Sequence, residues 1–161
     1  MGQERAMAKI IKPPEKIVIT DGVPTIFLAG SIEMGHGENW QLVFERELEE
    51  SRVTVLNPRR EEWDASWLQS IDNPQFRGQV EWELEGLEKA DIIAIYFVPE
   101  TRSPITLLEL GLFAQSKKLI VCCPDGYWRK GNVDIVCRRY SIATADSLEG
   151  LVDAVLNKIQ I

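Results

Sequence analysis

One carboxylate lies within an otherwise apolar segment of the chain. Residues 104–114 read PITLLELGLFA, in which Glu109 is the only charged residue and Thr106 the only other polar one. Burying an unpaired carboxylate costs so much free energy that such a group is normally paired, protonated or retained for chemistry. Glu109 is therefore the first candidate for a reacting group. The residues alone leave a second interpretation open, in which Glu109 forms a buried ion pair with one of the arginines.

The sequence before Glu109 predicts where this carboxylate lies. Residues 92–98, IIAIYFV, form a short apolar run rich in β-branched and aromatic side chains, which is typical of a strand buried on both faces. Ser103 and Pro104 then predict a helix start, with Ser103 as the N-cap and proline at the first helical position. Glu109 falls in the second turn of this helix, just beyond the carboxyl end of a central strand. Open α/β sheets bind their ligands at that edge.

The other apolar segments alternate between strand and helix patterns. Further strands are expected at 25–29 (TIFLA), 53–56 (VTVL), 119–123 (LIVCC) and, in a short form, near 141–143. Helices are expected at 39–51, at 75–89 and after Asp146. In the helix over 75–89, a stripe of Phe76, Val80, Leu84 and Leu87 is expected to cover the sheet. This alternation predicts an α/β three-layer sandwich around a parallel sheet of about five strands.

The beginning of the chain differs from the rest. Its first 15 residues are largely polar and include Pro13 and Pro14, so we expect a flexible leader over residues 1–15. The remaining residues, 16–161, are expected to form a single domain. A chain of 161 residues with 45% hydrophobic content is an ordinary size and composition for one globular domain.

The charge and hydropathy of the chain argue against several kinds of partner. A net charge of -7 and a pI near 4.8 disfavour binding to a nucleic-acid polymer, because phosphate backbones require clustered positive charge. No apolar run approaches the ~20 residues that cross a bilayer, and the N-terminal segment lacks the apolar core of a secretory signal. We therefore expect no membrane partner and a cytoplasmic location.

The cysteines and the single histidine give little support to metal or redox chemistry. Cys122, Cys123 and Cys137 lie in or near hydrophobic segments without CxxC spacing, so reduced core thiols are expected. His36 lies in a glycine-rich turn and is expected to be a solvated loop residue. We accordingly expect neither a metal nor a cofactor. Cys137 stays open as a nucleophile, although no histidine partner is evident.

Polar residues and glycines follow each of the four main predicted strands. Because the carboxyl ends of parallel strands meet at one edge of a sheet, these residues are expected to lie together. The candidate binding residues among them are Gly30, Ser31, Asn57, Arg59, Arg60, Asp64, Ser103 and Asn132. Such a collection suits a sugar joined to a flat base.

Each of these residues also has an ordinary structural interpretation. Ser31 is equally compatible with a bond to a ribose or phosphate oxygen and with a helix-capping turn. Arg59 and Arg60 suit phosphate or base recognition, or surface ion pairs with Glu61 and Glu62. Asn132 suits either the site or a helix cap.

Several segments together resemble the nucleoside 2-deoxyribosyltransferase superfamily, and most of all its 2-deoxyribosyltransferase-like branch. They read FLAGSI, NPRR, QVEWEL, SPITLLELG and KGNV, with Asp91 opening the central strand. The similarity covers residues 25–140, so that residues 16–161 are expected to form a single domain of this type. The resemblance implies a flavodoxin-like fold, cleavage of N-glycosidic bonds in nucleosides or nucleotides, and a homo-oligomer in which a neighbouring subunit often completes the site.

The resemblance also implies roles for three residues. The nucleophilic glutamate of the family lies in an E-L-G motif and corresponds to Glu109. An aspartate just ahead of the central strand, credited with protonating the departing base, corresponds to Asp91, which is otherwise an ordinary turn residue. Six residues before the nucleophile, the transferases carry aspartate whereas the nucleotide hydrolases carry a serine that contacts the 5′-phosphate. This chain has Ser103 there, which favours a phosphorylated substrate.

The expected activity is therefore transfer or hydrolysis at the N-glycosidic bond of a deoxyribonucleoside or its monophosphate, through a covalent intermediate on Glu109. A carboxylate nucleophile splits one difficult displacement into two easier ones. Two alternatives remain at this point. One is a non-catalytic nucleotide-binding or sensing module that kept the pocket, and the other is a structural oligomer.

Overall fold

A computed structural model describes residues 7–32, 39–60 and 66–160, which contain a six-stranded parallel sheet. The strand order across the sheet is β1-β3-β2-β4-β5-β6. The strands are β1 (Lys9–Ile11), β2 (Thr25–Gly30), β3 (Thr54–Leu56), β4 (Ile92–Tyr96), β5 (Leu119–Cys122) and β6 (Ala143–Ala145). The predicted parallel α/β sheet is confirmed, with one strand more than the approximate number expected.

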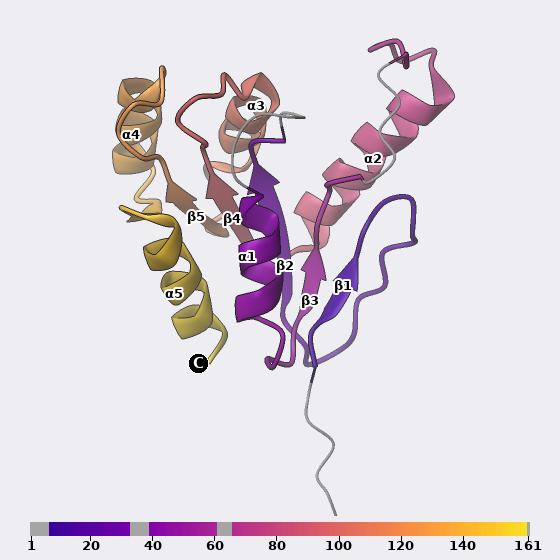
Figure 1. Cartoon of the computed structure of the whole chain (residues 1–161), viewed down its shortest axis with the longest axis horizontal. Coiled ribbons are helices and arrows are strands. Elements are labelled where there is room, and N and C mark those ends of the chain that lie inside the picture. Colours follow the sequence, from indigo (N-terminus) through magenta and orange to yellow (C-terminus); the bar gives the residue numbers. More distant parts are fainter. Residues whose placement is uncertain (1–6, 33–38, 61–65, 161) are drawn as a thin grey trace, which may run out of the picture.

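Helices cover both faces of this sheet and complete three layers. They are α1 (Trp40–Glu47), α2 (Pro74–Lys89), α3 (Pro104–Phe113), α4 (Lys130–Arg139) and α5 (Leu148–Ile159). Helices α1 and α5 lie in front of the sheet in Figure 1, whereas α2, α3 and α4 pack on the opposite face. The three-layer sandwich is thus confirmed.

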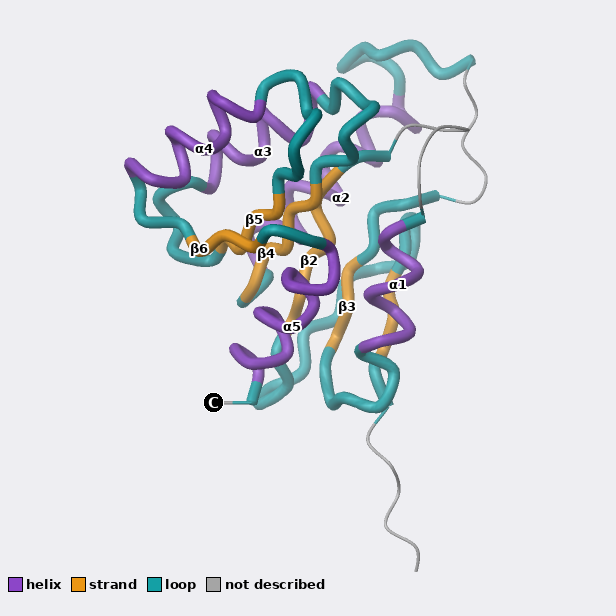
Figure 2. Tube along the Cα trace, turned by 60° about the vertical axis from the view of Figure 1, so that its left-hand side comes forward, coloured by secondary structure: helices purple, strands orange, loops and turns teal. Residues whose placement is uncertain are grey.

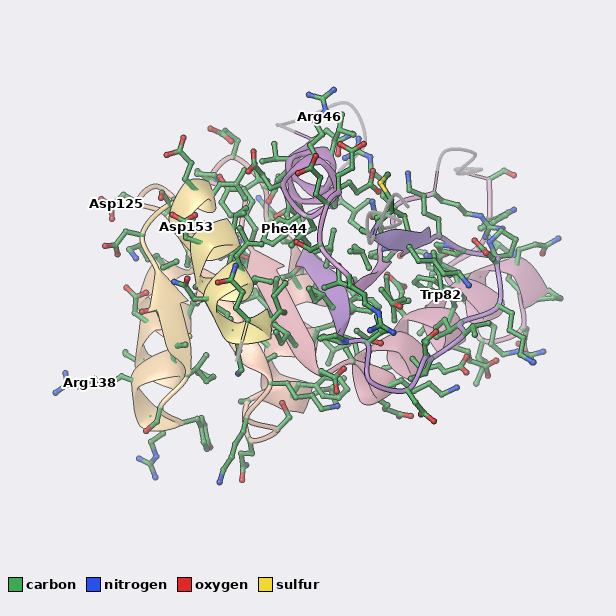
Figure 3. The ribbon with its side chains drawn as sticks, turned by 90° about the horizontal axis from the view of Figure 1, so that it is seen from below. Phe44, Arg46, Trp82, Asp125, Arg138 and Asp153 are labelled. Atoms are coloured by element: carbon green, nitrogen blue, oxygen red, sulfur yellow. The ribbon has the colours of Figure 1, made fainter. Side chains whose placement is uncertain are left out.

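Alternating side chains of the strands build a separate core on each face. On β2, Ile26 and Leu28 pack toward α1 and α5, while Phe27 packs toward α2, as the two-residue period of a strand requires. Figure 3 shows Phe44 of α1 and Trp82 of α2 on opposite sides of the sheet. Because both faces are covered, the central strands read as continuous apolar runs.

The leader expected over residues 1–15 is corrected by the structure over its second half. Lys9–Ile11 form β1, which pairs in parallel with β3 at the edge of the sheet. The Ile11 side chain is fully buried. The apolar part of this strand is only two residues long and lies among lysines and prolines, so it gave no strand signal in the sequence.

The stripe predicted for α2 is also corrected. The buried residues of α2 are Gln79, Trp82, Gly86 and Leu87, whereas Val80 and Leu84 are each 36% exposed. Gly86 sets this orientation, because a Cβ at this position would lie 2.7 Å from Cε2 of Phe27. The glycine therefore lets the helix approach the ring of Phe27 closely. Of the four buried residues, the predicted stripe contained only Leu87 and missed Gln79, Trp82 and Gly86.

The strand order creates a switch point between β2 and β4. From β2 the chain passes through α1 to β3, and from β4 it passes through α3 to β5, so the two connections leave in opposite directions. Open α/β sheets bind ligands in the crevice outside the carboxyl ends of two such strands. Figure 2 shows loops gathered beyond this end of the sheet. Within the described ranges, no helix has both the length and the apolar character to cross a membrane.

Candidate active site

A cavity of about 440 Å³ opens at this switch point, between α2 and α3. The end of β2 and the segment after β3 supply the rest of its wall. Its polar lining consists of Arg60, Gln69, Gln79, Glu83, Ser103, Thr106 and Glu109. Its apolar lining includes Phe76, Val80, Leu84, Ile105, Leu108 and Leu112. Mostly apolar walls with a few convergent polar groups are typical of a small-molecule site.

Glu109 is held inside this cavity by α3. Its side chain is 7% exposed and forms no hydrogen bond or ion pair within the described part of the chain. Burial, and secondarily the charge of Glu83, raise the pKa of Glu109 to about 8. None of the described arginines pairs with Glu109, so the ion-pair interpretation has no support among these residues. A buried carboxyl with a raised pKa in a cavity is the profile of a reacting group.

Glu83 is a second carboxyl of the cavity, and the sequence analysis missed it. It comes from α2, and burial raises its pKa to about 7. Like Glu109, it has no hydrogen bond or ion pair with the described residues. Glutamates are frequent along α2, so composition did not distinguish this one. Gly86, three residues later, lies on the same side of α2, but only the structure shows that this side turns inward.

Arg60 and Gln79 form the wall next to Glu83. The Gln79 Nε2 donates to the carbonyl oxygen of Pro58 at 3.1 Å, and its Oε1 accepts from Nη1 of Arg60 at 3.4 Å. The guanidinium of Arg60 also lies over the ring of Trp67, with Cζ 4.9 Å from the ring centroid. Arg60, one of the predicted binding residues, thus lies at the cavity. Gln79 also lies there, and it was not among the predicted residues.

Three hydroxyl groups meet where β2 and β4 end. The Ser31 Oγ lies 3.0 Å from Oγ1 of Thr101 and 2.5 Å from Oγ of Ser103, and it accepts from the backbone N–H of Val98 at 2.9 Å. The Thr101 Oγ1 is 2.7 Å from Oγ of Ser103. Of these three serines and threonines, only Ser103 lines the cavity. Ser31 instead ties the β2 end to the loop that leads into α3.

Ser103 occupies the N-cap position of α3, but not with the predicted side-chain bond. Its side chain makes no capping hydrogen bond, and its backbone is left-handed, with φ 47° and ψ 56°. Such a conformation costs a non-glycine residue about 1–3 kcal/mol and persists only where the surroundings fix it. Here the carbonyl of the preceding residue, Arg102, accepts from the Tyr127 hydroxyl at 2.6 Å and from the Trp128 Nε1 at 3.0 Å. The loop after β5 therefore holds the loop before α3.

Gly30 lies at the cavity for reasons of packing. A Cβ at this position would lie 2.5 Å from Cζ2 of Trp40 and 2.5 Å from the carbonyl oxygen of Tyr96. Any side chain would thus clash with β4 and α1. This contact accounts for the glycine without requiring close approach of a ligand.

Asp91 does not line the cavity. It precedes the amino end of β4, where its Oδ2 accepts from the backbone N–H of Thr25 at 2.7 Å. Its own N–H donates to the Thr25 carbonyl oxygen at 2.8 Å. This position corrects the proton-donor role expected for Asp91, because its carboxylate joins the starts of two neighbouring strands, whereas the cavity lies beyond their carboxyl ends. The sequence placed Asp91 correctly before β4, and only the family resemblance implied a catalytic role for it.

Three other predicted binding residues also lie outside the cavity. The Asn57 Nδ2 donates to Oε1 of Glu45 at 2.8 Å, and its Oδ1 accepts from the backbone N–H of Arg59 at 3.0 Å. The Arg59 guanidinium donates to Oε1 of Gln41 at 3.4 Å. Asn132 is exposed within α4 and does not cap it, since Arg129 occupies the N-cap position. Asp64 lies outside the described residues.

The cysteines offer no alternative nucleophile. All three are buried free thiols, and burial raises the pKa to about 11 for Cys122 and Cys137 and to about 12 for Cys123. The thiolate is the reactive form, so thiols with raised pKa values are inert at neutral pH. Within the described ranges, no cluster of histidine, cysteine, aspartate and glutamate has the arrangement of a metal site.

The segment that forms the cavity matches a known protein family. Residues 23–127, more than half of the chain, match the model of the family described as nucleoside 2-deoxyribosyltransferase like. The matched segment contains every described residue that lines the cavity. No curated protein gives a match to the chain.

Proposed function

This chain belongs to the nucleoside 2-deoxyribosyltransferase-like family, and we propose that it cleaves or transfers at the N-glycosidic bond of a deoxyribonucleoside or its 5′-monophosphate. The observation that carries the proposal is that two carboxyls, the buried Glu109 and the partly buried Glu83, line one cavity at the switch point of the sheet. Most enzymes that break a glycosidic bond through a covalent intermediate use a pair of carboxyl groups.

Glu109 is the proposed nucleophile and Glu83 the proposed proton donor. The ionised Glu109 forms an ester bond to C1′ of the sugar, while the C1′–N bond breaks and its electron pair stays with the base. Glu83 gives its proton to a ring nitrogen of the base, which leaves neutral. Water or a second base then attacks C1′, gives a proton to the ionised Glu83 and releases Glu109 as a carboxylate, so hydrolysis and transfer share the first step. General acid catalysis of this kind typically contributes ~10²–10⁴-fold.

The raised pKa values of the pair allow one protonated and one ionised carboxyl near neutral pH. Two carboxyls that influence each other titrate as a pair and hold one proton between them over an intermediate pH range. The raised pKa values of about 7 for Glu83 and about 8 for Glu109 put this range near neutral pH. Without substrate the higher pKa of Glu109 puts the shared proton mainly on that carboxyl. In the reactive form the proton is on Glu83, because positive charge developing at C1′ favours the ionised state of Glu109.

Ser103 is the proposed contact for the 5′ end of the substrate. It lies in the cavity at the amino end of α3, six residues before Glu109. A helix N-terminus favours an anion through its free N–H groups and its dipole. The hydroxyls of Ser31 and Thr101 fix the Ser103 side chain next to this point. These observations favour a phosphorylated substrate.

A homo-oligomer is also proposed, and the exposed face of α3 supports it. Ile105, Leu108 and Leu112 lie at the cavity and are 57–58% exposed. They lie three and four residues apart and so form one apolar stripe. A second copy of the chain would remove this stripe from water and narrow the cavity mouth.

The proposal is tested by incubating the protein with deoxynucleosides and their 5′-monophosphates, with and without a second free base, and measuring released or exchanged base. Glu109→Ala should abolish base release, whereas Glu149→Ala, an exposed control on α5, should not change it. A slow 2-fluoro sugar analogue should add one sugar mass to the peptide that contains Glu109. Full activity of Glu109→Ala would exclude the covalent route. A non-catalytic binding module would bind these ligands and release no base from any of them.

A further inference from the structure

Arg60 is the only lysine or arginine that lines the cavity within the described part of the chain. Its guanidinium is oriented by Gln79 and by the ring of Trp67, and it forms no ion pair with a described carboxylate. A guanidinium has five N–H donors and no acceptor, and only one of these donors is used by Gln79. A ligand group that meets Arg60 must therefore present acceptors.

The position of Arg60 relative to the two carboxyls indicates which part of a nucleotide it meets. Gln79, to which Arg60 is bonded, precedes Glu83 by four residues on α2, so the two side chains are neighbours about 6 Å apart. Glu109 and Ser103, in contrast, both belong to the α3 side. The group that protonates the departing base and the guanidinium thus share one wall, and the groups assigned to the sugar and its 5′ end share the other.

We propose that Arg60 selects 6-oxopurines, such as hypoxanthine and guanine, over adenine, an inference that rests on the function proposed above. In these bases N7 and O6 are neighbouring acceptors on one edge. Glu83 protonates N7 as the C1′–N9 bond breaks and its electrons pass to the base, and Arg60 donates a hydrogen bond to O6. Adenine has an amino group in place of O6, which would set its N–H donors against those of Arg60 and leave the guanidinium unpaired.

The test compares deoxyinosine with deoxyadenosine, which differ at this edge. The wild-type protein should show a kcat/KM for base release that is roughly 10- to 150-fold higher for deoxyinosine, the range expected from one charge-assisted hydrogen bond. Arg60→Gln should bring this ratio toward one, because an amide offers both a donor and an acceptor. The matched control is Arg46→Gln on α1, whose side chain projects outward in Figure 3, and it should keep the wild-type ratio.

Two results would overturn the assignment of Arg60. One is an unchanged ratio in a folded Arg60→Gln protein. The other is a selective loss of 5′-monophosphates relative to nucleosides without a change in the ratio, which would make Arg60 a phosphate contact. If Arg60→Gln does not fold by circular dichroism, Arg60→Met replaces the guanidinium by an unbranched side chain without an N–H donor, and it should lower the ratio. An unchanged ratio in that variant equally overturns the assignment.

Calorimetric titration with free hypoxanthine and adenine separates this inference from the proposed function. Tighter binding of hypoxanthine than of adenine, lost in Arg60→Gln, supports base selection by Arg60. Absence of base release from every substrate would overturn the proposed function but would leave this binding result valid. Base release without any preference between the two nucleosides would overturn the inference and leave the function in place.

Discussion

Replacing Glu83 by glutamine tests the paired-carboxyl mechanism most directly. With a pKa of about 7, roughly half of the Glu83 carboxyls carry a proton at pH 7, whereas an ordinary glutamate with a pKa of 4.5 would be protonated in about 0.3% of molecules. Burial thus keeps Glu83 partly protonated at a pH at which an ordinary glutamate is ionised. Glu83→Gln should slow release of a purine base by about 10²- to 10⁴-fold, since an amide cannot donate this proton.

The pH dependence of kcat/KM distinguishes the loss of the acid from a general loss of activity. In the wild-type protein, activity requires one proton in the pair, so the profile should rise and fall around pH 7 to 8. Glu83→Gln should remove the alkaline fall, because no acid is left to deprotonate. It should also move the acidic rise to lower pH, since the charge of Glu83 contributes to the raised pKa of Glu109.

Leaving groups and a neighbouring control complete this experiment. A nitrophenolate leaving group departs from a 2-deoxyriboside without being protonated, so Glu83→Gln should barely slow cleavage of such a substrate. Glu81→Gln, on the exposed side of α2, should match the wild type throughout. An equal loss for both leaving groups, or an alkaline limb that persists in Glu83→Gln, would refute the role of Glu83 as the acid.

Three further changes have defined outcomes. Burial favours the neutral form of Glu109, so the stability due to its raised pKa is present below pH 4.5 and is lost as pH rises toward 8, by up to about 1.4 kcal/mol per pH unit. The melting temperature of Glu109→Gln should therefore rise relative to that of the wild type as pH increases. A constant difference between the two melting temperatures would contradict this. Ser103→Ala should weaken a 5′-monophosphate about tenfold or more in calorimetry while barely affecting the nucleoside, and equal weakening of both would remove the phosphate contact. Leu108→Asp should convert an oligomer to a monomer in light scattering after gel filtration, because it puts a charge into the apolar stripe of α3, whereas an unchanged mass would place any interface elsewhere.

The layers of the fold could be predicted because each central element has a strong local pattern. Strands β2, β4 and β5 are unbroken apolar runs, and α3 begins at Pro104, as the sequence indicates. The edge strand β1 could not be predicted, because its three residues gain their order from pairing with β3. Local sequence carries no information about such a distant partner.

The candidate site was predictable where a residue contradicted its surroundings. Glu109 was identifiable because it is charged within an apolar helix, and the structure places it in the cavity. Glu83 was not, because it lies in a helix rich in charge and only the rotation of α2 directs it inward. Asp91, Asn57 and Arg59 lie in the right segments, but their bonds to other parts of the framework decide which way their side chains point.

The contact between Gly86 and Phe27 has a consequence for comparing this chain with its relatives. Because a Cβ at position 86 would come within 2.7 Å of the Phe27 ring, a larger residue there requires either a smaller one at position 27 or a rotation of α2. A rotation would turn Glu83 away from the cavity. In an alignment of the family, positions 27 and 86 should therefore covary. Relatives in which that compensation fails are expected to carry their proton donor at a different position on the helix, even where the E-L-G motif is intact.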